Sequence, residues 1–458
     1  MKKMLSLLLA AALLSGCMPV SDETTPSVSS ESGPADPVLA EAVYPEMAPY
    51  PVESSFFDAG TGVFDDEGFS QAYDAWRGNL DLRQEIPQGY ADSLSGWFRN
   101  SIPAFLECSG GNAVCSPLST YIALAMVAEC TTGDSQQEIL NRLGSDSMDA
   151  LRTQAGQVWK AHYCDDGASA CVLANSLWLS NGLVYDADTT NRLAGDYYAS
   201  VFQGALGSEE MNQLLRDWIN DQTGGLLEEQ SQNLSLDPQT VLALASTIYY
   251  RAKWSNEFHS ENNTEEIFHS PSGDRAVTFM NRTLTYGPYY WGDDFGAVSL
   301  GLEDRSQMWL ILPDEGLSPA DILRSGHALD LALGGWLETA NQKSLRVNLS
   351  LPKFDAAADR NLNQTLKALG IQSVFSRETA DFSPILPETP AWLDSVNHAA
   401  RVKIDEEGVE AAAYTVMMMA GAAMPPQEEM DFVLDRPFLF VITSRDNLPL
   451  FAGIVNEP

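Results

Sequence analysis

Residues 112–129, NAVCSPLSTYIALAMVAE, join a short apolar stretch to a longer segment with helical spacing. Proline is favoured at the first position of a helix, and a serine before it supplies a hydroxyl that can cap the first turn. We therefore predict a strand that ends near Ser116 and a helix that begins at Pro117. Just before them, residues 91–107 have the periodicity of an amphipathic helix.

Outward from this stretch, helical patterns crowd the first half of the domain and strand patterns the second half. Residues 240–254, TVLALASTIYYRAKW, are almost uninterruptedly apolar and predict a central strand buried on both faces. Residues 345–354 alternate strictly between apolar and polar, which predicts another strand. This segregation indicates an α+β fold rather than alternating βαβ units. Further strands are predicted within 172–180, 308–316 and 431–458, and a short helix within 361–371.

The composition suits a large globular domain that works outside a cell. Of the 458 residues, 45% are hydrophobic, so a sizeable core can be buried, and the formal net charge is −37. A negative charge of this size argues against nucleic acid as a partner, because phosphates need a basic surface. Its simplest role is solubility.

The N-terminus carries a targeting signal. Two lysines precede an apolar run that is too short to span a bilayer, and the run ends in Leu14-Ser15-Gly16-Cys17. This pattern is similar to a bacterial lipoprotein signal, in which the cysteine is acylated and becomes the first mature residue. An ordinary secretory signal with a chance cysteine is the alternative. We expect Cys17 to anchor the chain to the cell envelope on its extracytoplasmic side, or the chain to be secreted.

A tether is predicted to follow the signal. No basic residue lies between Lys3 and Arg77, and Pro, Ser, Thr and acids dominate the first part of this segment, which is typical of a disordered spacer. Aromatic residues gather between 55 and 90, and that part could pack on the domain. The predicted organisation is a signal over 1–16, a tether and pre-domain segment over 17–87, and one domain over 88–458.

Five cysteines remain in the domain: Cys108, Cys115, Cys130, Cys164 and Cys171. Disulfides are allowed outside the cytoplasm, but an odd number leaves at least one thiol without an intrachain partner. Cys164 and Cys171 flank the turn-like sequence DDGASA and could pair; the sequence does not decide the pairing. No C-x-x-C spacing occurs, so neither zinc nor thioredoxin chemistry is expected.

No catalytic motif is evident. The chain lacks H-E-x-x-H, G-x-S-x-G, P-loop and G-x-G-x-x-G patterns. Ser116 could be imagined as a nucleophile with His398 as its base, which would make the protein a lipid-anchored hydrolase. However, a nucleophile elbow needs flanking glycines, and Ser116 is followed by proline. A helix cap and a core histidine explain the two residues better, so we expect no enzyme, no cofactor and no bound metal.

Several motifs together resemble the serpin family. NAVCSPLSTYIALAM, LANSLWLS and STIYYRAKW followed by Phe258 occur in the serpin order. They are followed by LPKFD, LKALGI, EEGVEAAA, DRPFLFVI and the closing LFAGIVNEP. The resemblance covers about residues 88–458. It implies a fold of three β-sheets with about nine helices and an exposed reactive-centre loop, which falls on residues 408–430.

The resemblance also implies a mechanism. In an inhibitory serpin, a serine protease acylates the reactive loop, and the N-terminal half of the loop inserts as a strand into the main sheet. The protease is then distorted before it can deacylate. The hinge residues would be Gly408, Val409, Glu410, Ala411, Ala412 and Ala413. Alternation along a strand places Val409, Ala411, Ala413, Thr415 and Met417 on one uncharged face, as insertion into a sheet requires.

Other positions follow from the resemblance. Ser116, Ser119, Ser246 and His398 match the polar cluster beneath the opening sheet, the shutter. Trp254, Lys353 and Glu406 match the top of the sheet, the breach, where Lys353 and Glu406 would form a salt bridge. The chain departs from the family pattern at Ser246, where asparagine is usual, at Val409, where Thr or Ser is usual, and at Tyr414, where a small residue is usual.

The family's usual loop length puts the scissile bond at Ala422–Ala423, with Met419–Ala420 and the bonds around Gly421 as competitors. No Lys or Arg lies in residues 405–426, DEEGVEAAAYTVMMMAGAAMPP, so small apolar substrate pockets fit best. The expected partners are elastase-like or subtilisin-like serine proteases, with cysteine proteases as a further class, and the expected state is a monomer. A non-inhibitory serpin that acts as a cell-surface binding or adhesion protein is the main alternative.

Overall fold

The computed structural model describes residues 37–58, 60–82, 86–107, 110–232, 234–335, 341–409 and 428–458. The chain divides at Asp36 into two units, and the second, Pro37–Pro458, contains every described residue. Several predicted features therefore lie outside the described residues: the signal over 1–16, the tether up to residue 36, Cys17, Cys108, and the loop positions Glu410, Ala411, Ala412, Ala413, Ala422 and Ala423.

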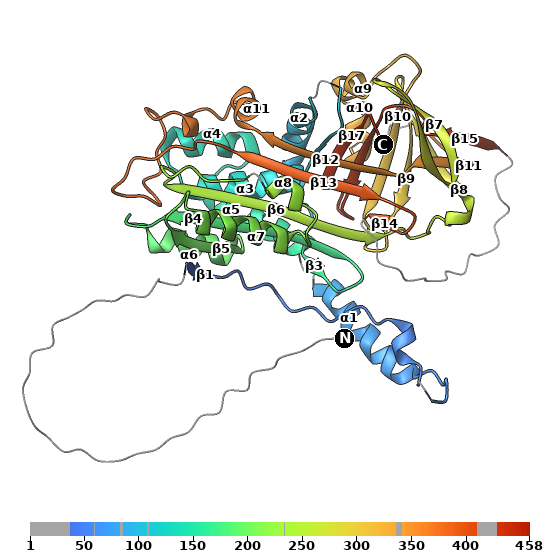
Figure 1. Cartoon of the computed structure of the whole chain (residues 1–458), viewed down its shortest axis with the longest axis horizontal. Coiled ribbons are helices and arrows are strands. Elements are labelled where there is room, and N and C mark those ends of the chain that lie inside the picture. The colour runs from blue at the N-terminus through green and yellow to red at the C-terminus, as the bar shows by residue number, and fades with distance from the viewer. Residues whose placement is uncertain are drawn as a thin grey trace, which may run out of the picture. The chain divides into compact units, whose positions relative to one another are not determined.

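One sheet of eight strands runs across the domain (Figure 1). Its seven-strand path is mostly antiparallel; only β4 and β5 run parallel. The order is β1 (Val38–Ala40), β5 (Ala199–Gly204), β4 (Ala170–Ser180), β6 (Leu242–Lys253), β14 (Gly408–Val409), β13 (Asn397–Ile404) and β12 (Phe354–Asn361), and β3 (Cys164–Asp165) pairs with β4.

A second sheet has nine strands. Its order is β15 (Glu429–Val433), β11 (Asn341–Pro352), β8 (Gly273–Trp291), β9 (Phe295–Gly301), β10 (Gln307–Pro313), β16 (Phe438–Thr443), β17 (Pro449–Val455) and β2 (Ala113–Cys115), and β7 (Thr264–Ser270) pairs with β8.

The expected α+β fold class is confirmed, with one difference in how the strands connect. Hydrogen bonds link the described strands into two sheets rather than three. The long strand β8 pairs with β7 through its first residues, with β11 along most of its length, and with β9 through its last residues. The pairing of β11 with β8 shifts register between Leu345 and Val347, an irregularity of the kind that lets a strand pair bend.

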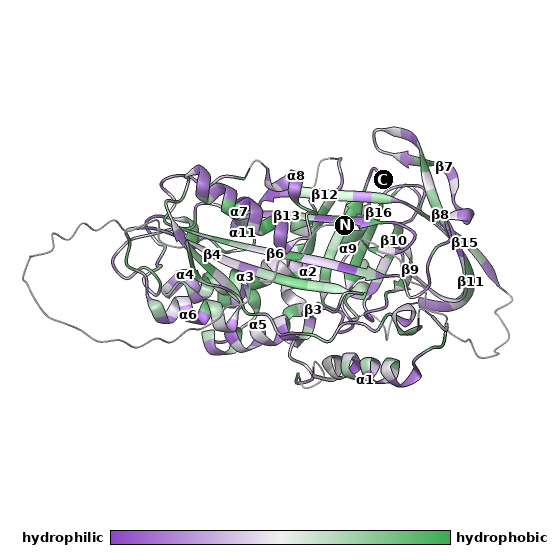
Figure 2. Cartoon of the chain, turned by 60° about the horizontal axis from the view of Figure 1, so that its bottom comes forward, coloured by the Kyte–Doolittle hydropathy of each residue, from purple (hydrophilic) through white to green (hydrophobic). Residues whose placement is uncertain are grey.

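Eleven α-helices occur in the described ranges. They are α1 (Asp66–Leu82), α2 (Ser95–Leu106), α3 (Pro117–Glu129), α4 (Gly133–Leu143), α5 (Met148–His162), α6 (Ala187–Asp196), α7 (Glu209–Gln222), α8 (Glu228–Ser231), α9 (Pro319–Ser325), α10 (His327–Ala332) and α11 (Asn363–Ala368). Figure 2 shows hydrophilic residues on outer helices such as α4 and α6. By contrast, twelve of the thirteen α3 residues are buried, which places that helix in the core.

The helix cap predicted from the sequence is confirmed. Ser116 has extended backbone angles, and its hydroxyl accepts a hydrogen bond from the backbone N–H of Ser119. Pro117 occupies the first helical position, where a missing N–H costs nothing. The strand before it, β2, lies at the end of the nine-stranded sheet beside β17. This local sequence therefore fixes where α3 starts.

Part of the segment ahead of the predicted domain boundary packs on the domain, beginning at residue 37. Strand β1 pairs with β5, and the N–H of Gln203 donates to the carbonyl of Pro37 over 2.7 Å. The ring of Tyr44 packs against those of Trp159 and Tyr163. The later part of the segment forms α1, coloured blue in Figure 1. Residues 37–82, which we call the N-terminal strap, thus add a strand to the edge of the eight-stranded sheet.

Candidate functional site

The first two residues of the predicted reactive-loop region form a strand inside the eight-stranded sheet. Gly408 pairs with Lys253, and Val409 pairs with Ala252 of β6 on one side and Ile404 of β13 on the other. Val409 is 3% exposed. The two described residues of the predicted hinge therefore already lie between the strands that would have to separate for a longer insertion.

Glycine is needed at 408 because the backbones approach closely there. A Cβ atom on Gly408 would lie 2.7 Å from the Cα of Lys253 and closer still to the carbonyl oxygen of Ala252. Real Cβ atoms do not approach other heavy atoms so closely, so a side chain at 408 would push β14 away from β6.

The turn between β13 and β14 depends on Asp405, a residue that the sequence analysis missed. Its carboxylate accepts hydrogen bonds from the N–H groups of Glu407 (3.0 Å) and Gly408 (3.3 Å). Its own N–H donates to the carbonyl of Gly408 over 3.2 Å. An aspartate two or three residues before a glycine is a known turn signal, so the sequence DEEG could have indicated this role.

Trp254, the residue that follows β6, holds the same turn in place. Its ring is 1% exposed, and its Nε1–H donates to the carbonyl of Asp405 over 2.9 Å. Its backbone N–H donates to the carbonyl of Glu407 over 3.0 Å. The side chain predicted for the top of the sheet is thus bonded to the backbone just before the predicted reactive loop.

Lys353 and Glu406 form an ion pair beside this turn, with Nζ and Oε1 2.6 Å apart. Asn263, which the sequence analysis did not single out, donates from Nδ2 to the same oxygen over 2.6 Å. Burial raises the pKa of the Glu406 carboxyl, but the hydrogen bonds from Lys353 and Asn263 outweigh it and hold the pKa below its usual range. Glu406 is therefore a stable anion that ties the turn to two other segments.

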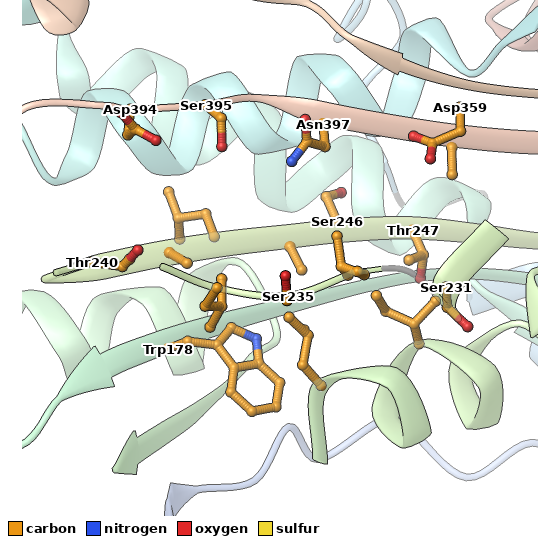
Figure 3. Close-up of a pocket in the computed structure, with 18 of the residues that line it drawn as sticks. Trp178, Ser231, Ser235, Thr240, Ser246, Thr247, Asp359, Asp394, Ser395 and Asn397 are labelled. Atoms are coloured by element: carbon orange, nitrogen blue, oxygen red, sulfur yellow. The ribbon is translucent and has the colours of Figure 1, made fainter. Parts of the chain in front are cut away.

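Below Val409 the sheet is open. In the part of the chain that the structure describes, β6 and β13 are joined only through β14, and a cavity of about 250 Å³ lies beside them. Figure 3 shows Ser246 and Thr247 on the β6 side of this cavity and Ser395 and Asn397 on the β13 side. We call it the inter-strand cavity.

The cavity explains one wrong prediction. The sequence predicted that the strand within 240–254 would be buried on both faces, but residues 242–246 are only partly buried. Their apolar side chains belong to a strand that has neighbours on one edge and the cavity on the other. Among the described residues, the first part of β6 thus has a neighbouring strand on one edge only, which is why it is less buried than its apolar sequence predicted.

The four predicted shutter residues lie together at the floor of this opening. The N–H of Ser116 donates to Nε2 of His398 over 2.9 Å. On the other side, the hydroxyl of Ser246 donates to the carbonyl of Ser119 over 3.2 Å. Ser246, at the position where the family usually has asparagine, thus bonds to the backbone of α3. The start of α3 bridges β6 and β13.

His398 is a neutral core residue. Burial lowers the pKa of its imidazole to about 4, and Nε2 accepts the hydrogen bond from Ser116. The hydroxyl of Ser116 is engaged with the N–H of Ser119 rather than with the ring. The two residues are therefore not arranged as a serine nucleophile and its base. In that arrangement the hydroxyl of Ser116 would bond to the imidazole of His398.

Two features are absent from the residues that the structure describes. No three His, Cys, Asp or Glu side chains within those ranges are grouped so that they could hold a metal ion. None of the helices there is both long and apolar enough to cross a membrane.

Comparison with known proteins identifies the family. The sequence profile described as "Serpin (serine protease inhibitor)" matches residues 104–458. The chain belongs to the serpin family. It is 29% identical to an uncharacterized serpin-like protein of Thermococcus kodakarensis, over 77% of this chain and 82% of that one. It is also 29% identical to leukocyte elastase inhibitor of Homo sapiens, over 79% of this chain and 98% of the inhibitor.

Solved serpin structures share the fold. The native state of the thermophilic serpin tengpin superposes with a TM-score of 0.72 at 24% identity, covering 82% of this chain and 95% of that one. The native stressed conformation of Arabidopsis AtSerpin1 gives a TM-score of 0.68 at 25% identity, covering 81% and 99%. The latent state of tengpin gives 0.67. This serpin therefore has the architecture of a family of serine protease inhibitors.

Proposed function

We propose that this serpin traps a serine protease by inserting its cleaved reactive loop into the inter-strand cavity. The observation that carries the proposal is the position of β14, which lies between β6 and β13 at one end of an otherwise open gap. A loop that continued from Val409 along the same path would run antiparallel to both neighbours. On the edge of β6 that faces β14, the described strands pair only with Ala252 and Lys253. The continued loop would pair with the backbone groups of the remaining β6 residues along that edge.

The register of β14 supports a specific end state. If the pairing of Val409 with Ala252 and Ile404 continues, residue 415 comes opposite both Ser246 and His398. Directly opposed residues on antiparallel strands point to the same face. Thr415 would then direct its hydroxyl toward the polar cluster at the start of α3, while Ala411 and Ala413 would meet the apolar part of the floor. The loop sequence is thus compatible with both parts of the cavity.

The uncharged loop favours a protease with small apolar pockets. A trypsin-like pocket carries a buried acid that would stay unpaired against residues 419–423, which contain no Lys or Arg. Leukocyte elastase inhibitor, whose name states its target, is among the relatives of this chain. We infer an elastase-like or subtilisin-like target and cleavage at Ala422–Ala423.

The test is incubation with a panel of purified proteases, followed by denaturing electrophoresis and mass spectrometry of the released C-terminal peptide. We expect a denaturation-resistant complex with an elastase or subtilisin and a cut after Ala422. Efficient trapping of trypsin and not of elastase would contradict the specificity. Cleavage by every protease without any complex would instead support the non-inhibitory alternative.

We also propose that the protein is held at the cell envelope through acylated Cys17. The support is the sequence of residues 1–17, with two lysines, a short apolar run and a cysteine after Leu-Ser-Gly. Cys17→Ser should move the protein from the membrane fraction to the soluble extracytoplasmic fraction. Unchanged fractionation of the variant would overturn the lipid anchor without affecting the proposed inhibition.

A further inference from the structure

Cys164 and Cys171 stand directly opposite each other in the hairpin formed by β3 and the start of β4. Opposed residues of antiparallel strands have Cα atoms about 4.5–5.5 Å apart, which lies inside the range of about 4.4–6.8 Å that a disulfide spans. Because opposed residues point to the same face, the two sulfur atoms lie on one side of the hairpin. Both side chains are 4% exposed.

The turn between the two cysteines is held in place by its own hydrogen bonds. The N–H of Asp166 donates to the carbonyl of Ser169 over 3.2 Å. The Asp166 carboxylate accepts from the N–H groups of Ala168 (3.0 Å) and Ser169 (2.7 Å). Gly167 takes a positive φ of 85°, which a residue with a side chain rarely adopts. The hairpin therefore holds the two cysteines directly opposite each other, both as thiols in this structure.

We propose that Cys164 and Cys171 form a cross-strand disulfide that fastens the attachment point of the N-terminal strap. The oxidant is a disulfide, either a small molecule such as glutathione disulfide or a protein. One cysteine thiolate attacks it and releases one thiolate, and the second cysteine displaces the other from the mixed disulfide. One new S–S bond forms, one S–S bond breaks, and the two cysteine protons leave on the two thiols released.

The strap is attached to this hairpin at several points. Nε1–H of Trp76 donates to Oδ2 of Asp166 over 2.8 Å, and the N–H of Tyr50 donates to the Asp166 carbonyl over 2.8 Å. The rings of Tyr50 and Trp76 also pack edge to face, with their centroids 5.1 Å apart, so the two residues that bond to Asp166 contact each other as well. A hairpin closed by a disulfide would hold Asp166 in the geometry that both donors need.

The same hairpin is also tied to the strand beside the inter-strand cavity. The guanidinium of Arg251 on β6 donates to the carbonyl of Gly167 over 3.1 Å, and Cys171 pairs with Tyr250 on β6. Ala252, the next residue after Arg251, is the partner of Val409. The proposed cross-link therefore lies in a hairpin that contacts both the strap and β6, the strand that bounds the cavity. By stiffening this hairpin, it would help to keep the strap attached to β6.

The first test locates the bond. The full chain is folded in a mixture of reduced and oxidised glutathione, denatured, alkylated without reductant and digested with a protease that cuts before aspartate. Cuts at Asp165 and Asp166 separate the two cysteines, so a disulfide keeps the two peptides joined until reductant is added. We expect the joined pair in most molecules. Two alkylated cysteines, or a link from either one to Cys108, Cys115 or Cys130, would overturn the proposal.

The second test measures what the bond holds. Trypsin can cut the strap after Arg77, next to Trp76. We expect reductant to raise the rate of this cut severalfold in the oxidised wild-type protein. In the matched Cys164→Ser/Cys171→Ser variant the rate should be high with or without reductant. A rate that reductant leaves unchanged in the oxidised wild-type protein would show that the cross-link does not fasten the strap.

Discussion

The backbone N–H of Ser116 donates a hydrogen bond of 2.9 Å to Nε2 of His398, and this bond joins the start of α3 to β13. On the opposite side, Ser246 joins β6 to the same turn of α3 through the carbonyl of Ser119. Both strands that flank the inter-strand cavity, β6 and β13, are thus attached to the start of α3. In the described structure, the only strand that links β6 to β13 is β14. A new strand can enter between them without breaking a direct ladder.

His398 should make the stability of the native state depend on pH. Burial lowers its folded-state pKa to about 4, below the ordinary value of about 6.5 for an unfolded chain. The stabilisation by the neutral ring is therefore complete above about pH 6.5 and falls as the pH drops toward 4, by up to ~3 kcal/mol. Urea unfolding of the wild type and of His398→Gln, which keeps a hydrogen-bond acceptor, should diverge least near pH 4. A difference that is constant between pH 4 and 7.5 would contradict this assignment.

Gly408→Ala should displace the hinge strand. The added Cβ would collide with the backbone of Ala252 and Lys253, so we expect a loss of native-state stability of about 1–3 kcal/mol, the usual cost of overpacking. Gly195→Ala in α6 is the matched control, because its Cβ would meet open space, and it should be neutral or slightly stabilising. Equal urea midpoints for the two variants would show that the close approach at 408 is unimportant.

Val409→Arg should turn an inhibitor into a substrate. Val409 is buried between β6 and β13, and an arginine there would lack a partner at a cost of several kcal/mol. The arginine should be expelled from this place in the uncleaved protein and would have to re-enter it for the loop to insert. Insertion should therefore slow, while cleavage at Ala422–Ala423 continues because the substitution leaves residues 422 and 423 unchanged. Glu410→Arg is the matched control: strand alternation would put residue 410 on the opposite, solvent-facing side of an inserted strand, so this variant should inhibit nearly as well as the wild type. A denaturation-resistant elastase complex at parental yield from Val409→Arg would refute the insertion mechanism.

The local elements could be predicted from the sequence because their signals are local. Ser116 and Pro117 mark the start of α3 through cap chemistry alone, and the apolar run within 240–254 identifies β6. The positions of Trp254, Lys353 and Glu406 came from the family resemblance, and the structure places these three residues around one turn.

The remaining features depend on contacts between distant parts of the chain. Strand β1 has three residues without an alternating pattern, and its partner Phe202 is far away in the sequence. The buried carboxylate of Glu129 forms ion pairs with Arg152 and Arg192 from two other helices. No spacing in the sequence predicts that these three residues meet. The opening beside β6 is likewise set by where β13 lies, so the apolar run alone predicted a fully buried strand.

The most direct test of loop insertion is hydrogen exchange of the two flanking strands before and after the loop is cut. A protease that cleaves near Ala422 without being trapped would supply the nicked protein. If the loop inserts, peptides covering residues 242–251 and 397–402 should become strongly protected, because their backbone groups gain partners from the new strand. Unchanged exchange in both strands after complete cleavage would contradict the account.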